Sequence, residues 1–240
     1  MSGELEGVEG RLRDAERWLE PATGDGEEPH LPSAEMIVAD EEEYRRLPAV
    51  IETYRAGQAL VRGDAPGTVR YAQRAIELAL ADDHLCRASA AALLGLVYWG
   101  SGDLEAGHQG YSACVEGLRR AGFIADILGC SIALADIRST QGRLGEALRT
   151  FEQALQLAAE PGGSVLRGTA DMYVGMSEIA CQRDDLHAAR QLLLRSQELG
   201  EHAGLPQNQY RWRVAMARLR EAEEVCTARS ACSTRRSACM

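Results

Sequence analysis

The sequence of 240 residues contains no lysine: its 26 basic residues are all arginine, against 36 acidic residues. Without lysine, no phosphate-binding loop of the G-x-x-x-x-G-K-[ST] type can form. The net charge of −10 argues against a direct nucleic-acid surface for the chain as a whole. No apolar run approaches the length of a membrane span, and the opening MSGELEGVEG is no signal peptide. We therefore expect a cytoplasmic protein that binds neither nucleic acid nor membrane.

Sequence signals for chemistry are also missing. The five histidines share no metal-ligand spacing, and Cys226, Cys232 and Cys239 do not form a C-x-x-C pair. There is no G-x-S-x-G and no G-x-G-x-x-G motif. We predict a protein that is not an enzyme, with no metal site, no catalytic residues and no cofactor.

Aromatic residues make up only 5% of the chain, and the 45% of hydrophobic residues are mostly alanine and leucine. This composition favours helices over sheets. Three segments share one pattern: SGDLEAGHQGYSACVEGL, QGRLGEALRTFEQALQL and RDDLHAARQLLLRSQEL. In each, a turn precedes a leucine, and a large apolar residue follows seven positions later. The pairs are Leu104 with Tyr111, Leu144 with Phe151, and Leu186 with Leu193.

The leucines recur at intervals of 40 and 42 residues, which indicates an internal repeat. Another apolar helical pattern precedes each turn, so the unit is helix A, a tight Gly/Asp turn and helix B. We predict an all-α fold, a right-handed α-solenoid of antiparallel helix pairs over residues 48–222. A partial repeat with a lone helix B is expected at 1–21, and an acidic loop insertion with a short helix at 22–47. The acidic run 40–43 suits the first turn of a helix.

The repeat resembles the tetratricopeptide repeat (TPR). The family's pattern matches two successive units here: Leu94, Gly95, Tyr98, Gly102, Leu104 and Tyr111, then Gly142, Leu144, Ala147 and Phe151. The resemblance implies that Gly95 and Ala147 are small where two helices touch, and that Tyr111 and Phe151 fill space shared with the next repeat. Arg138 and Ala180 replace the family's helix A tyrosine.

The phrases ALLGL, IALADIR and LRGTADMYVGMSE look like the helical sensor region of large LuxR-type transcription regulators of the MalT class. In that family a nucleotide-binding module precedes the array and a helix-turn-helix follows it. Neither motif occurs in this sequence. The resemblance therefore implies the sensor segment alone, truncated at both ends, with the missing regulator modules in the parent protein.

Helix A lines the concave face in such arrays, and counting back from each turn places charged residues on it. The expected set is Trp99, Asp136, Asp171, Glu178, Arg211 and Arg218. Two interpretations remain open. The set could form a groove for an effector small molecule or a protein segment, or a series of inter-repeat salt bridges of small individual value.

The tail 223–240 breaks the pattern, because the sequence VCTARSACSTRRSACM stands where a turn and a helix B are expected. With G/C-rich codons, which the absence of lysine suggests, a shifted frame would encode an amphipathic Ala/Leu helix there. We interpret the tail as frameshifted. Three functional hypotheses follow: a sensing array, a stand-alone TPR adaptor that binds a protein segment, or a gene product without a function of its own.

Overall fold

The computed structural model describes residues 7–19, 38–159 and 165–237, with side chains up to residue 227. Every regular element in these ranges is a helix, which confirms the all-α prediction. The α-helices are α1 (Val8–Arg17), α2 (Glu41–Val61), α3 (Ala65–Leu78), α4 (His84–Gly100), α5 (Leu104–Ala121), α6 (Ile124–Thr140), α7 (Leu144–Ala158), α8 (Thr169–Gln182), α9 (Leu186–Leu199) and α10 (Asn208–Ser237), and a short 3₁₀ helix, η1, spans Glu201–Ala203.

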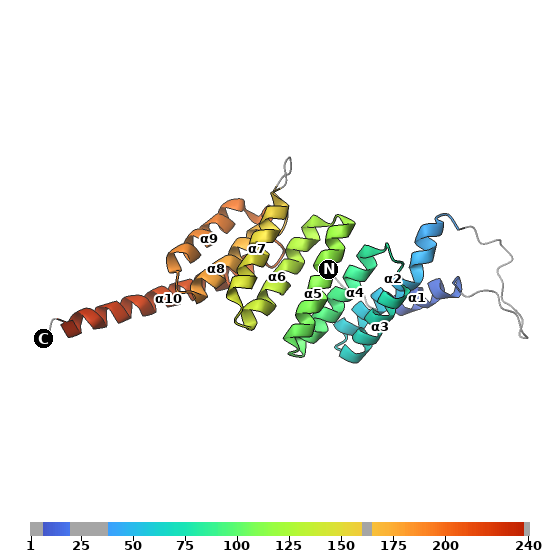
Figure 1. Ribbon diagram of the computed structural model, residues 1–240, viewed down its shortest axis with the longest axis horizontal. Helices are drawn as coiled ribbons and strands as arrows, with labels where there is room; N and C mark the ends of the chain where they lie inside the picture. The colour runs from blue at the N-terminus through green and yellow to red at the C-terminus, as the bar shows by residue number, and fades with distance from the viewer. Residues whose placement is uncertain (1–6, 20–37, 160–164, 238–240) are drawn as a thin grey trace, which may run out of the picture. The chain divides into compact units, whose positions relative to one another are not determined.

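The chain divides into two compact units, Met1–Gly117 and Leu118–Met240. In the first, α1 lies against α2, α2 pairs with α3, and α4 is followed by the larger part of α5. In the second, α6 pairs with α7, α8 pairs with α9, and α10 contacts both α8 and α9. Short turns of three residues join α2 to α3, α4 to α5, α6 to α7 and α8 to α9 (Figure 1).

One turn geometry joins helix A to helix B in every pair. The second-last residue before helix B has a left-handed backbone, at Gly63 (φ 76°), Gly102 (φ 89°), Gly142 (φ 76°) and Asp184 (φ 64°). The amide of the next residue donates to the carbonyl five positions earlier, as in the bond of 2.8 Å from Arg143 N to Arg138 O. This is the Schellman ending of a helix, and it needs a residue that tolerates positive φ. Glycine therefore recurs at these turns because the backbone there adopts a positive φ.

Aspartates at three of these turns begin the following helix. Asp64, Asp103 and Asp185 accept hydrogen bonds of 2.9 to 3.0 Å from amides three residues later. Such N-caps satisfy amides that lack an intrahelical partner. The Gly/Asp turn of the sequence repeat therefore ends one helix and starts the next.

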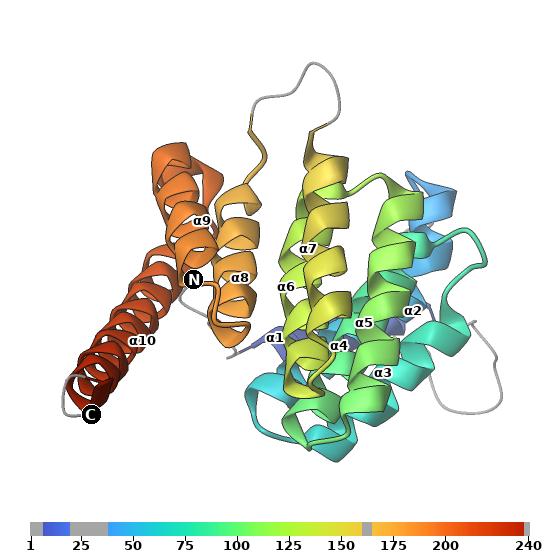
Figure 2. The same ribbon diagram turned by 60° about the vertical axis from the view of Figure 1, so that its left-hand side comes forward.

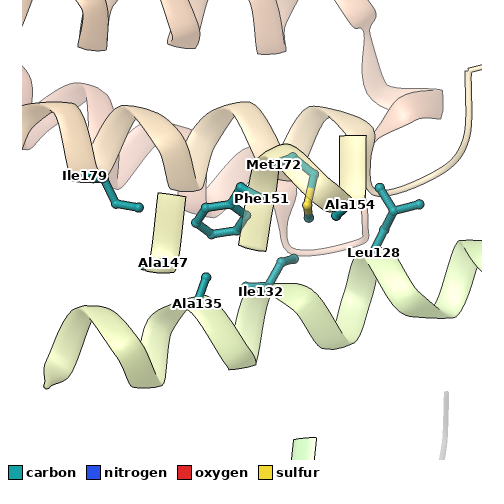
Figure 3. Packing of buried hydrophobic residues seen from close by; sticks show 8 residues of the cluster. All are labelled: Leu128, Ile132, Ala135, Ala147, Phe151, Ala154, Met172 and Ile179. Carbon is teal, nitrogen blue, oxygen red and sulfur yellow. The ribbon is translucent and has the colours of Figure 1, made fainter. Parts of the chain in front are cut away.

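The core of the second unit surrounds the ring of Phe151, which is 1% exposed. Its cluster includes Leu128 and Ile132 from α6, Ala147 from α7, and Met172 and Ile179 from α8. Figure 3 shows the ring between α6, which carries Leu128 and Ile132, and α8, which carries Met172 and Ile179. Phe151 therefore joins its own helix pair to the first helix of the next pair.

In the first unit, close approach of α4 and α5 depends on glycine. A Cβ at Gly95 would lie 2.9 Å from Cδ2 of Tyr111, and a Cβ at Gly110 would lie 2.7 Å from the Cα of Gly95. Leu94, on the same helix, packs against a cluster of buried alanines from α2, α3 and α4. The two helices approach so closely because neither carries a side chain at the crossing.

Helix α2 begins with the acidic run. The side chain of Asp40 accepts hydrogen bonds from the amides of Glu42 and Glu43, at 2.9 and 3.0 Å. The helix then continues without a break through Pro48 to Val61, so the predicted boundary between 47 and 48 falls inside it. Pro48 removes one hydrogen bond, but the buried residues Ala49 and Ile51 keep the following turn packed in the core.

Two other sequence predictions concern the ends. The expected acidic loop lies mostly at 20–37, outside the described residues. Helix α10 runs through the predicted boundary between 222 and 223 and ends at Ser237.

Candidate functional site

An open cleft of about 420 Å³ lies in the second unit, along the A helices α6, α8 and α10. Its walls are polar and charged at the centre and include one aromatic side chain. The lining residues are Asp136, Ser139, Thr140, Gly175, Glu178, Ile179, Gln182, Tyr210, Arg211, Val214 and Arg218. Four of the six residues expected in the groove, the two arginines with Asp136 and Glu178, thus lie together.

The guanidinium of Arg211 stands among three carboxylates. It lies 3.8 Å from Oδ2 of Asp136, 3.8 Å from Oε2 of Glu178 and 3.9 Å from Oδ1 of Asp171. None of these distances is short enough for a hydrogen bond. Only 16% of the Arg211 side chain is exposed, and its Nη1 atom is buried without a hydrogen-bond partner. Electrostatic attraction between Arg211 and the carboxylates therefore holds the centre of the cleft together, and Nη1 of Arg211 keeps unused hydrogen-bonding capacity.

Arg218 makes the one close ion pair of the cleft. Its Nη1 is 3.0 Å from Oε1 of Glu178, which joins α10 to α8. The Arg218 side chain is 67% exposed, so the pair sits at the rim and is screened by water. The interpretation of the charged set as inter-repeat salt bridges accounts for this pair, and the three longer contacts of Arg211 with Asp136, Asp171 and Glu178 are also ion pairs between repeats.

Asp171 is placed behind the cleft and does not line it. Its side chain is 0% exposed, and Oδ2 accepts a hydrogen bond of 2.8 Å from the amide of Leu205. Burial raises the pKa of this carboxyl, against the opposing effects of the Leu205 amide and of Arg211. Its other oxygen, Oδ1, is buried without a hydrogen-bond partner. Asp171 therefore fixes the segment before α10 to α8.

The carboxyl of Asp136 has a strongly shifted titration. Desolvation raises its pKa to about 6; Arg211 opposes this shift and Glu178 adds to it. The side chain is still 38% exposed, so the carboxyl exchanges protons with the solvent in the cleft. Asp136 thus carries a negative charge that the protein compensates only in part.

The remaining residue of the predicted groove, Trp99, lies in the first unit. Its ring packs edge-on against Tyr111, with 6.3 Å between centroids. Two apolar residues that the same register places on the concave face, Ile132 and Val174, are buried in the core at 9% and 0% exposure. In α6 and α8 the structure thus places Asp136 and Glu178 in the cleft, while Ile132 and Val174, one turn earlier in each helix, pack in the core.

Sequence reasoning missed Tyr210, Thr140 and Gln182. Tyr210 is 72% exposed at the edge of the cleft, one residue before Arg211. Thr140 and Gln182 each follow the last inward position of their helix. A wider window at the helix ends would have found them, because a cleft wall spans about 100° of a helix surface.

The site has the properties of a binding surface. It offers carboxylates, guanidinium groups, hydroxyls and an amide at fixed positions on three helices. In the described ranges, no three His, Cys, Asp or Glu side chains group as metal ligands do.

The family model for the MalT-like TPR region matches residues 49–235. The chain belongs to this family. Its helix pairs and Gly/Asp turns are therefore those of a MalT-like TPR region. No curated protein matches the chain. Within the described residues of this MalT-like TPR region, no helix has the length and apolar character to span a membrane.

Proposed function

We propose that this MalT-like TPR region is the non-catalytic sensing element of a LuxR-type transcription regulator, and that it binds its effector in the cleft of the second unit. The observation that carries the proposal is the environment of Arg211. Three carboxylates at 3.8 to 3.9 Å hold the guanidinium without a hydrogen bond, in an open cleft of about 420 Å³. A ligand can supply the hydrogen bonds that the carboxylate oxygens do not receive from Arg211.

The cleft is built from three successive repeats, which suits a sensor. Asp136, Glu178 and Arg211 come from α6, α8 and α10, so a bound molecule would contact all three A helices at once. Binding would then stabilise one arrangement of the repeats over others, which is the requirement for transmitting a signal to attached modules. The proposal places this function in the cytoplasm, and the buried thiols of Cys86 and Cys114 agree with a reducing compartment.

A thermal-shift screen against a small-molecule library and a peptide library would test the proposal. Effectors should raise the melting temperature of the wild-type protein, since binding to the folded state stabilises it. Glu178→Gln and Arg218→Ala should abolish the shift. Arg195→Ala removes an exposed ion pair on α9, away from the cleft, and should leave the shift unchanged. Hits that survive both cleft variants would contradict the proposal.

A stand-alone adaptor that binds a protein segment is the second candidate function. One observation favours it: the first unit has a largely apolar groove of about 650 Å³ between α2 and α4. Tyr54 and Leu85 in this groove are 61% and 41% exposed. Peptide hits that are lost in Tyr54→Ala, with no small-molecule hits, would favour the adaptor.

A further inference from the structure

The charges around the cleft do not balance. Asp136, Asp171 and Glu178 contribute three carboxyl groups, and Arg211 and Arg218 contribute two guanidinium groups. Arg218 is committed to Glu178 at 3.0 Å, while Arg211 is shared among all three carboxyls at longer range. With every group ionised the set carries one net negative charge, for which the described residues of the cleft hold no further cation.

Asp136 is the carboxyl that faces the solvent in the cleft without a close cation. Among the described residues its ion-pair partner is Arg211, at 3.8 Å, which is too long for a hydrogen bond to its oxygens. The pKa of this carboxyl is raised to about 6, mainly by desolvation; Arg211 opposes the rise and Glu178 adds to it. A proton takes the place of a missing positive charge when the pH falls below that value.

The rest of the cleft suits an organic cation. Tyr210 exposes 72% of its surface at the edge, and the face of a tyrosine ring attracts ammonium and guanidinium groups. An anion at the same place would bring a fourth negative charge to a guanidinium that already has three carboxyls within 4 Å. Ser139, Thr140 and Gln182 supply the additional oxygens that an N–H-rich group needs as acceptors.

We propose that the group recognised in this cleft is an alkyl-ammonium or alkyl-guanidinium cation, bound to Asp136 and Glu178 and covered by the ring of Tyr210. The inference rests on the proposed function and names the chemical class of its ligand. Such a cation occurs on a small amine or on a lysine or arginine side chain of a protein segment. The chemistry recognised at the cleft is the same in both cases.

The test is a chemical-shift titration of the ¹⁵N-labelled full chain at low ionic strength. Two cationic probes distinguish the sources: agmatine, as a free amine, and the blocked tripeptide Gly-Arg-Gly. Gly-citrulline-Gly is the neutral isostere of the second probe, and Gly-Glu-Gly is the anionic control. We expect amides of α6, α8 and α10 to shift with a cationic probe, and its affinity to exceed that of the isostere by at least about tenfold.

Asp136→Asn is the decisive variant, since it keeps the shape of the side chain and removes the charge. This variant should weaken binding of the cationic probes by at least about tenfold at about pH 7.5, and it should leave the affinity for the neutral isostere unchanged. Glu198→Gln, in an exposed pair on α9, is the matched control and should bind as the wild type does. Lowering the pH to about 5 should weaken binding to the wild type, because Asp136 then takes up a proton.

The pH effect is assigned to Asp136 by its surroundings. Arg211 of α10 and Glu178 of α8 are the charged groups that act on its carboxyl. Arg218 is bound to Glu178, and Asp171 is buried behind Arg211. The pH dependence should therefore disappear in Asp136→Asn.

Equal binding of the arginine and citrulline peptides, or tighter binding of the glutamate peptide, would overturn the inference. If no cationic probe shifts the cleft while a neutral or anionic effector from the screen does, the cation inference fails and the proposed function stands. If nothing binds the cleft, both fail.

Discussion

The ring of Phe151 occupies the space that a side chain at Gly175 would need. A Cβ built on Gly175 would lie 2.2 Å from Cζ of Phe151, far inside van der Waals contact. Phe151 belongs to α7 and Gly175 to α8, so this contact joins one helix pair to the next (Figure 3). Figure 2 shows α7 and α8 from a second direction. The absence of a side chain at one position thus sets how closely two repeats approach.

We expect Gly175→Ala to lower the free energy of unfolding by roughly 1–3 kcal/mol, because the methyl group would displace a fully packed ring. Urea denaturation would measure the change. Gly129→Ala on α6 is the control: nothing lies within 4 Å of its added Cβ, so this variant should be neutral or more stable. Equal losses in the two variants would contradict the account.

Asp184 has φ of 64° at a turn where the other helix pairs have glycine. Because left-handed backbone is unfavourable for a residue with a Cβ, we expect Asp184→Gly to stabilise the protein by about 0.5–1 kcal/mol. Thermal unfolding would show a higher midpoint. The reciprocal change Gly142→Ala should destabilise by about 1 kcal/mol. A lower midpoint for Asp184→Gly would mean that the aspartate makes a contact worth more than its backbone strain.

Asp171→Ala should destabilise the fold by about 2–3 kcal/mol. The change leaves the amide of Leu205 without its 2.8 Å acceptor and deprives Arg211 of a buried counter-charge. The sequence analysis placed Asp171 in the groove, but the structure buries its side chain completely. Glu178→Ala, in contrast, breaks a rim pair and should cost less than about 1 kcal/mol. Urea titrations of both variants would separate the two roles.

The pKa of about 6 at Asp136 predicts a pH effect on stability. The folded state binds the proton of the Asp136 carboxyl more tightly than the unfolded state does. The protonated carboxyl therefore contributes its full stabilisation below about pH 4, and this stabilisation is lost as the pH rises through about 6. Asp136→Asn should abolish this loss of stability between about pH 4 and pH 6. We therefore expect the variant to gain stability relative to the wild type between about pH 4 and pH 6. A constant difference across that range would contradict the shifted pKa.

Arg55 holds α1 against α2. Its guanidinium donates to Glu16 at 2.7 Å and to Glu9 at 3.2 Å, and only 13% of its side chain is exposed. The hydrogen bond from Arg55 lowers the pKa of Glu16, so acid weakens the contact. We expect Arg55→Ala to speed hydrogen exchange across Val8–Arg17 without changing α8 to α10. Arg74→Ala, in an exposed pair on α3, should leave the exchange of α1 unchanged.

The repeat could be predicted from sequence because its cause is local. A left-handed residue ends helix A and an aspartate starts helix B, and both preferences belong to a few neighbouring residues. The spacing of the turns then fixes the helix lengths. The apolar positions Ala147, Phe151 and Leu193 repeat with the helical period and lie in the core, at 0%, 1% and 1% exposure.

The sequence by itself thus determined the all-α fold and the helix pairs, and it singled out five charged residues for one face. Only the tertiary structure decided which of the charged residues line the cleft. Asp171 and Glu178 lie seven residues apart on one helix, yet one is fully buried and the other is 24% exposed. The difference arises because the Leu205 amide, 34 residues further along the chain, covers one end of α8 and leaves the other open to solvent. The helical periodicity of the sequence cannot reveal that contact, because it joins residues 34 positions apart.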